Sequence, residues 1–193
     1  MLKNVSKKYS SDISRIHISA LSEDFLPSLG FNFLKNFYDG IIGKFGIFGF
    51  VDLQKNEIAG FVIGTIDMRG FFKTAIFSNF FVLCSLLALR LIQKPALIKY
   101  VLQTILYPKK DEGPPAELVI IAVSDKYRGK GIGKKLVKAL EIEMRKRKIK
   151  EYKLTVTQRN KGANAFYKSL DFYKFGEFNL YNKDWNVLVK KLK

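Results

Sequence analysis

Three glycines at alternate positions stand out among the residues that could do chemistry: Gly129, Gly131 and Gly133. A β-branched apolar run, 119–123, precedes them, and a helical pattern of apolar residues begins directly after them. Glycine lets backbone N–H groups approach an anion closely, and the N-terminus of a helix adds a favourable dipole. The segment is therefore predicted to hold a phosphate group; the alternative is a glycine-rich helix start that binds nothing.

Two familiar phosphate-binding motifs fit the segment poorly. A P-loop ends in Gly-Lys-Ser/Thr so that a hydroxyl can bind magnesium, but here Lys134 is followed by Lys135. The dinucleotide-binding motif needs Gly-x-Gly-x-x-Gly directly after its strand, but residues 124–128 separate the glycines from the strand. Glu151 stands about where a ribose-binding acid would be expected, which is weak support by itself.

A third pattern fits better and extends beyond the glycines. The loop, Arg128-x-x-Gly131-x-Gly133, resembles the Arg/Gln-x-x-Gly-x-Gly/Ala signature of the GNAT (Gcn5-related N-acetyltransferase) family. A downstream segment is similar to a second family motif and reads Asn160-x-x-Ala163-x-x-x-Tyr167, followed by Leu170-Asp171-Phe172. The joint match covers residues 115–175 and is much more specific than the loop alone.

The resemblance implies that the chain binds acetyl-CoA as its acyl donor. In the family, the loop and helix start hold the pyrophosphate, the preceding strand pairs with the pantetheine arm, and an asparagine contacts the coenzyme. The residues at matching positions are Ile121, Ala122, Val123, Arg128, Gly129, Lys130, Gly131, Ile132, Gly133, Lys134 and Asn160. The asparagine has a structural alternative as a helix N-cap.

Acyl transfer from a thioester to an amine needs a base, an oxyanion donor and an acid. A free alkyl amine has a pKa near ~10.4, so a base must take its proton, while the leaving thiolate gains from an acid. By resemblance Tyr167 is the acid and Glu117 matches the base of the histone-acetylating branch, with the Val123 N–H as the oxyanion donor. The structural alternatives are a core aromatic for Tyr167 and a solvated acid for Glu117.

One position departs from the branch of the family that acetylates protein N-termini. That branch carries a glutamate five residues before the asparagine, and Thr155 stands there in this chain. A threonine hydroxyl cannot act as a base at neutral pH, which counts against acetylation of ribosomal-protein N-termini.

Composition bounds the remaining choices. A chain of 193 residues, 48% of them apolar, is typical of one folded domain, here 1–193. The single Cys84 and single His17 disfavour a metal site and supply no argued nucleophile. No apolar stretch follows residues 1–8, so no secretory signal is expected and a cytoplasmic location is the default. The sequence leaves a monomer and a homodimer open.

A formal net charge of +17 favours an anionic partner, although part of it simply solvates the surface. Nucleic acid is disfavoured because the chain has no zinc-finger spacing and no RRM signature. The charge favours an anionic acceptor over a polyamine.

Hydrophobic periodicity predicts an α/β protein with a mixed sheet. By resemblance this is the GNAT fold, a mostly antiparallel central sheet flanked by helices. We expect helices at 10–21, 28–43, 131–148 and 160–170, and strands at 45–51, 58–66, 117–123, 152–157, 172–181 and 185–192.

A helical insert is predicted at about 68–112, between the strands at 58–66 and 117–123. By resemblance these are the third and fourth strands of the family's fold. Residues 68–110 contain no Asp or Glu but seven Lys or Arg. Two helices are expected there, mostly packed on the domain, and the first falls short of the ~20 residues needed to span a bilayer. A lid on the acceptor site and peripheral membrane contact are the functional alternatives.

The sequence therefore predicts an N-acetyltransferase that moves an acetyl group from acetyl-CoA directly to a primary amine. A small anionic acceptor is favoured, such as a (nucleotide-linked) amino sugar. The alternatives are a protein or peptide amine acetyltransferase and a non-catalytic acyl-CoA-binding module.

Overall fold

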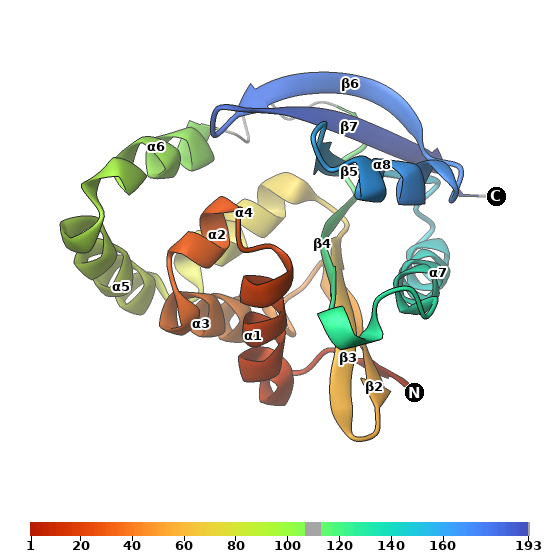
Figure 1. Cartoon of the computed structure of the whole chain (residues 1–193), viewed down its shortest axis with the longest axis horizontal. Helices are drawn as coiled ribbons and strands as arrows, with labels where there is room; N and C mark the ends of the chain where they lie inside the picture. Colours follow the sequence, from red (N-terminus) through yellow and green to blue (C-terminus); the bar gives the residue numbers. More distant parts are fainter. Residues whose placement is uncertain (107–112, 193) are drawn as a thin grey trace.

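The computed structural model describes residues 1–106 and 113–192 (Figure 1). The end of the predicted insert, residues 107–112, therefore lies outside the described residues. Seven strands form one sheet in the order β1-β2-β3-β4-β5-β7-β6. Their bounds are β1 Leu2–Asn4, β2 Ile47–Gln54, β3 Glu57–Thr65, β4 Glu117–Val123, β5 Glu151–Thr157, β6 Tyr173–Leu180 and β7 Lys183–Lys191.

Helices cover both faces of the sheet, which explains why its central strands are so apolar. In β3 every residue after Glu57 is buried, as expected for a strand covered on both sides. Figure 1 shows α1 and α3 on one side of β3 and β4, and α7 on the other. The helices are α1 Ser10–Ala20, α2 Phe25–Ser28, α3 Phe31–Ile41, α4 Met68–Phe77, α5 Phe80–Gln93, α6 Ile98–Leu106, α7 Ile132–Lys146 and α8 Lys161–Lys168.

The parallel pair β4 and β5 is joined at one register position, Glu117 opposite Lys153, with the Lys153 N–H donating to the Ala116 carbonyl at 3.0 Å. Beyond that position the two strands part. β4 stays paired with β3 as far as Val123, and β5 pairs with β7 along its whole length. The far end of β4 therefore has an edge that no described strand covers.

A β-bulge lies within β4 next to this opening. The register with β3 shifts between Ile63, which faces Ile120, and Gly64, which faces Leu118, so Val119 is the extra residue. A bulge bends its strand and raises the local twist. It thus helps to turn the end of β4 away from β5.

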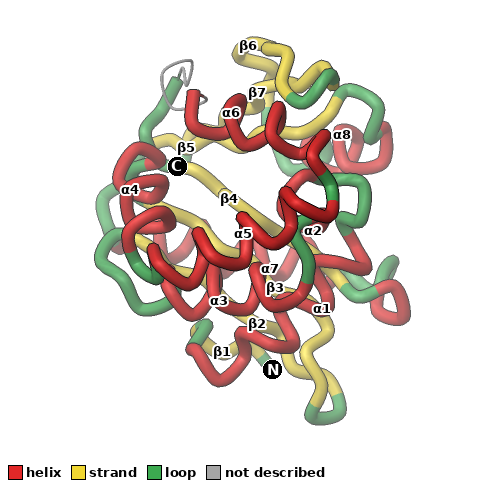
Figure 2. The backbone as a smooth tube through the Cα atoms, turned by 90° about the vertical axis from the view of Figure 1, so that its left-hand side faces the viewer, coloured by secondary structure: helices red, strands yellow, loops and turns green. Residues whose placement is uncertain are grey.

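The segment between β3 and β4 forms three helices where two were predicted. The break falls at Ser78 and Asn79, and α4 and α5 meet at a bend of 81°. The Asn79 side chain donates to the Asn36 carbonyl of α3 at 2.9 Å, which fixes the corner against the domain. Figure 2 shows α4, α5 and α6 following one another around the side of the molecule away from α7.

Other differences from the prediction are local. β1 was not expected, and β2 runs to Gln54, so Asp52 lies inside a strand and is fully buried rather than in the turn. The first turn of α1 has no side-chain cap.

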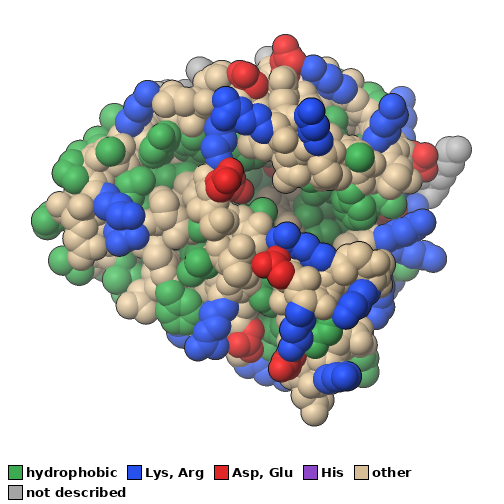
Figure 3. Space-filling view, in the orientation of Figure 1, with side chains coloured by type: hydrophobic (Ala, Val, Ile, Leu, Met, Phe, Trp, Pro, Cys, Tyr) green, Lys and Arg blue, Asp and Glu red, His purple; other side chains and the backbone are tan. Residues whose placement is uncertain are grey.

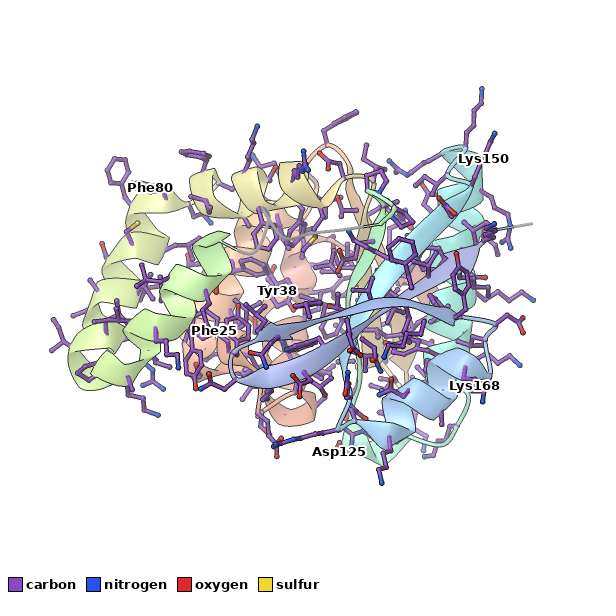
Figure 4. All side chains as sticks on the ribbon, turned by 90° about the horizontal axis from the view of Figure 1, so that it is seen from above. Phe25, Tyr38, Phe80, Asp125, Lys150 and Lys168 are labelled. Carbon is purple, nitrogen blue, oxygen red and sulfur yellow. The ribbon has the colours of Figure 1, made fainter. Side chains whose placement is uncertain are left out.

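The only histidine of the chain is a core residue of α1. His17 is 3% exposed, and its Nδ1 lies 2.7 Å from the hydroxyl of fully buried Tyr38 (Figure 4). Burial lowers the pKa of His17 to about 4. The imidazole is therefore neutral in the folded protein at neutral pH, and its contact with Tyr38 is part of the protein core.

We expect folding stability to fall as the pH drops from about 6.5 toward 4. The folded pKa of His17 lies below the unfolded value near ~6.5, so its contribution is complete above that value and is lost on the way to 4, by at most roughly 3 kcal/mol. Urea unfolding at a series of pH values measures this loss, and NMR follows the single imidazole directly.

The matched control for this prediction is the double variant His17→Leu/Tyr38→Phe, which removes both polar partners together. Its carboxylates are those of the parent, so only the His17 part of the pH dependence should disappear. An imidazole that titrates near its unfolded value in the folded protein would contradict the prediction.

Candidate active site

The glycine loop leaves open space beside its backbone at the start of α7. Gly129 and Gly131 have φ values of +73° and +76°, which strain any residue with a side chain. No atom lies within 4 Å of a Cβ placed on either residue. Gly131 is the N-cap of α7 and supplies no side-chain acceptor, so the first N–H groups of the helix are left for a ligand.

Exposed cations surround this loop, but they are not equivalent. Arg128 pairs with Asp125 at 2.9 Å. Lys135 donates to buried Asp52 at 2.7 Å, whereas exposed Lys134 forms no ion pair with a described residue. Lys134 is therefore available for the predicted phosphate contact. Lys135 instead neutralises a buried carboxylate, a role that the sequence patterns did not indicate.

The third glycine has a different role from the other two. A Cβ on Gly133 would lie 3.3 Å from Cζ of Phe166, a side chain of α8. Gly133 therefore lets α8 approach the first turn of α7. The sequence motif predicts a glycine at this position, but it does not show that the ring of Phe166 leaves little room for a side chain there.

The backbone N–H and C=O groups of successive residues in β4 point alternately toward β3 and toward the opening. The Ser124 N–H donates to the Ala59 carbonyl of β3 at 2.9 Å. Because backbone groups of successive residues point to opposite edges of a strand, those of Ala122 also face β3, and those of Val123 and Ile121 face the uncovered edge. Of the three predicted pantetheine contacts, Ile121 and Val123 are thus oriented for pairing with an extended ligand, and Ala122 is not.

Asn160 caps α8, as its structural alternative predicted. Its Oδ1 accepts the Ala163 N–H at 3.0 Å. Within the described part of the chain its side-chain amide nitrogen donates to no group, so the cap leaves that nitrogen available. Both predicted roles are compatible in one side chain.

Tyr167 is a buried aromatic of α8 with an uncommitted hydroxyl. The side chain is 7% exposed, and its ring packs edge-on against Phe172 with centroids 5.5 Å apart. Buried tyrosines usually hydrogen-bond their hydroxyl, but this one bonds no residue among those described. Burial raises its pKa, so at neutral pH it is a proton donor that lacks an acceptor.

Glu117 lies at the point where β4 and β5 meet, and it is 3% exposed. The alternative of a solvated acid at a strand start is therefore wrong. Six residues separate it from Val123, about 20 Å along the strand, and four separate it from Ile121, about 13 Å. The predicted base and the predicted oxyanion donor thus stand at opposite ends of β4.

The β6–β7 hairpin arches over this region and is tied to α6. Thr104 Oγ1 lies 2.6 Å from the Tyr181 hydroxyl, and Gln103 accepts the Tyr181 N–H at 3.0 Å. The rings of Phe25, Tyr100 and Tyr181 pack together beside a pocket of about 130 Å³. Figure 3 shows the surface hollowed beneath the hairpin, with both basic and acidic side chains around the hollow.

The range that a family profile matches spans the glycine loop, β4, β5 and the tyrosine of α8. The profile of the Acetyltransferase (GNAT) family matches residues 13–172. The chain belongs to this family. It is an acyl-CoA-dependent N-acetyltransferase with acetyl-CoA as its donor substrate.

Solved structures share the fold at low sequence identity. The Escherichia coli ribosomal-protein-S18-alanine N-acetyltransferase is similar with a TM-score of 0.65, at 18% identity over 100% of this chain and 94% of that one. An N-acetyltransferase from Staphylococcus aureus Mu50 has a TM-score of 0.66, at 17% identity over 98% of this chain and 100% of that one. The ribosomal-protein-alanine N-acetyltransferase from Brucella melitensis has a TM-score of 0.65, at 16% identity over 100% and 99%. By sequence, no curated protein matches the chain.

The candidate site carries groups that fit coenzyme A. Open N–H groups and unpaired Lys134 suit a pyrophosphate, and the uncovered edge of β4 suits the amides of a pantetheine arm. Among the described residues, no three His, Cys, Asp or Glu side chains lie together in a way that could hold a metal ion.

Replacing Gly131 by Ala should weaken acetyl-CoA binding. The left-handed backbone would relax and redirect the first N–H groups of α7, so we expect the KM for acetyl-CoA to rise about tenfold. Steady-state kinetics measures the change. Gly43→Ala is the matched control, because Gly43 also has a positive φ, +83°, and open space around it but lies outside the site. Equal effects of both variants on KM would contradict the assignment.

Proposed function

We propose that the protein transfers the acetyl group to the primary amine of a small anionic acceptor, such as a (nucleotide-linked) amino sugar. The observation that supports the proposal is the opening between β4 and β5: the glycine loop follows the end of β4, and Tyr167 lies on α8, which follows the end of β5. The net charge of +17 favours an acceptor of negative charge.

The geometry suggests how the donor lies. With its pyrophosphate at 129–134, the extended arm would run along Val123 and Ile121 and so direct the thioester toward Glu117. Along this path the Ile121 N–H is about 7 Å nearer to Glu117 than the Val123 N–H. We therefore favour Ile121 as the oxyanion donor, in place of the Val123 N–H that the resemblance implied.

Direct transfer then needs one proton taken up and one released. The neutral amine attacks the thioester carbonyl, a C–N bond forms, and the N–H on β4 stabilises the oxyanion. Glu117 takes the amine proton through water, since the spacing from Ile121 is too large for direct contact. The C–S bond breaks as Tyr167 gives its proton to the sulfur, and the tyrosinate recovers a proton from water.

The helical insert is proposed as a fixed wall of the acceptor side. Contacts of α6 with Tyr181 and Asn182 hold the turn of the β6–β7 hairpin in place. A moving lid would have to break these bonds and the aromatic cluster of Phe25, Tyr100 and Tyr181 at each turnover. In this proposal the insert is a fixed wall of the acceptor site and does not open and close during turnover.

A protein or peptide amine is the second candidate acceptor, because two of the structural neighbours are ribosomal-protein-alanine N-acetyltransferases. Thr155 counts against it, since no carboxylate stands at that position of β5. A cytoplasmic location and the choice between monomer and homodimer remain predictions from the sequence.

A thiol-release assay with a panel of amines tests the proposal. The panel contains a phosphorylated amino sugar, its uncharged parent, a polyamine and a short peptide. We expect the highest kcat/KM for the anionic sugar. Preference for the peptide would support the second candidate, and tight acetyl-CoA binding without turnover of any amine would indicate a binding module.

Tyr167→Phe should lower kcat by at least about a hundredfold, because the thiolate would leave without its acid. The loss in folding stability should be small, since the hydroxyl bonds no described residue. Tyr152→Phe is the matched control: its hydroxyl donates to Glu141 at 2.8 Å, so it should lose stability and keep kcat. If both variants lose kcat alike, Tyr167 acts by packing only.

Glu117→Gln should remove the rising limb of the rate–pH profile and reduce kcat by about a hundredfold, since an amide cannot accept the amine proton. The KM for acetyl-CoA should change little, because the predicted coenzyme contacts lie farther along β4. Steady-state rates across pH measure both effects. An unchanged profile would assign the base to another group or to water.

A further inference from the structure

Helix α5 is apolar on its outer side as well as on the side that packs on the protein through Leu83. Its outer side carries large apolar side chains: Phe81 is 83% exposed, Ile92 78% and Leu89 59%. Its one charged residue, Arg90, turns inward, and its Nε donates to the Ser28 carbonyl of α2 at 2.9 Å. A helix at a water-facing surface is normally arranged the other way round.

The corner between α4 and α5 extends this apolar surface. Phe77 is 73% exposed, and its ring stacks on that of Phe80 at 6.3 Å. Figure 4 shows Phe80 at the outer end of the insert, far from Tyr38 in the core. Ile98 and Leu102 of α6 are also exposed. We call Ile76, Phe77, Phe80, Phe81, Val82, Leu89, Ile92, Ile98 and Leu102 the apolar patch.

The segment that carries the apolar patch has charges of one sign only. Residues 68–106 contain no Asp or Glu. Arg69, Lys73 and Lys94 are exposed, and none of them forms an ion pair with a residue that the structure describes. The segment therefore combines projecting aromatic rings with exposed cations and no acid of its own, the composition that favours anionic lipid. Glu23 and Asp24, from another part of the chain, line the pocket beside Tyr100 at the α6 end of the segment, not at the α4–α5 corner.

The same charge pattern disfavours a second copy of the chain as the occupant. A twofold contact places each patch against itself, so unpaired cations would face one another in both copies. A bilayer with anionic headgroups neutralises these cations and takes up the rings. Extended apolar surfaces of this kind mark interaction sites in soluble domains.

Among the described residues, no single helix is long and apolar enough to cross a bilayer, and α4 with α5 meets that length only as a pair bent by 81°. We propose that the α4–α5 corner lies on the surface of an anionic membrane. In this arrangement Phe77, Phe81 and Ile92 enter the boundary between headgroups and acyl chains, and Lys73 and Lys94 contact the headgroups. The proposal does not depend on the identity of the amine acceptor.

Co-sedimentation with vesicles tests the proposal, using phosphatidylcholine alone and phosphatidylcholine mixed with phosphatidylglycerol. The full chain should bind the mixed vesicles at low salt, and added salt should weaken binding. Phe77→Ser/Phe81→Ser should lower the partition coefficient by at least about tenfold. Phe45→Ser is the matched control, because Phe45 is 94% exposed and lies outside the patch.

A second pair of variants tests the charges. Lys73→Gln/Lys94→Gln should weaken binding to mixed vesicles by about tenfold or more, and Lys150→Gln/Lys168→Gln, on the other side of the molecule in Figure 4, should change it little. All variants replace exposed side chains, so thermal unfolding and acetyl-CoA binding should match the parent.

Two results would overturn the proposal. One is a protein that stays in solution with mixed vesicles at low salt. The other is a loss of binding as large in Phe45→Ser as in the patch variant. Sedimentation velocity without lipid detects the rival occupant: a dimer that only Phe77→Ser/Phe81→Ser dissociates would assign the patch to a second copy.

Discussion

The site depends on one constraint, the parting of β4 and β5 beyond a single shared register position. β4 is held by β3 and bent by its bulge at Val119, while β5 is held by β7 along its whole length. Neither strand can then close the gap. Uncovered backbone groups inside a protein need a polar partner, so the edge at Ile121 and Val123 is suited to a ligand that carries amides of its own.

The parting also sets the positions of the other functional groups. α7 follows the end of β4 and points the first N–H groups of the helix at the opening, while α8 follows the end of β5 and brings Tyr167 to the same place. Gly133 lets these two helices approach each other, because any side chain there would meet Phe166. The glycine loop and Tyr167 thus each follow the end of one of the two strands that part.

The inner and outer sides of the helical insert differ in what they contact. Its inner side fixes the β6–β7 turn through α6 and packs Leu83 and Leu97 into the protein. Its outer side is apolar and cationic. The family profile does not explain that outer side, since a wall for a water-soluble acceptor needs no exposed phenylalanines.

The sequence alone determined the family and the bounds of β4 to the residue, because local patterns of β-branched residues and glycines carry both. That the glycine loop binds a phosphate stays a prediction. The sequence did not determine which side of α5 faces the protein, since apolar residues surround that helix and give its periodicity no direction. Nor did it show that Glu117 is buried, that Ala122 faces β3, or that the Tyr167 hydroxyl lacks a described partner. These depend on strand register and on contacts between distant segments, which only the tertiary structure decides.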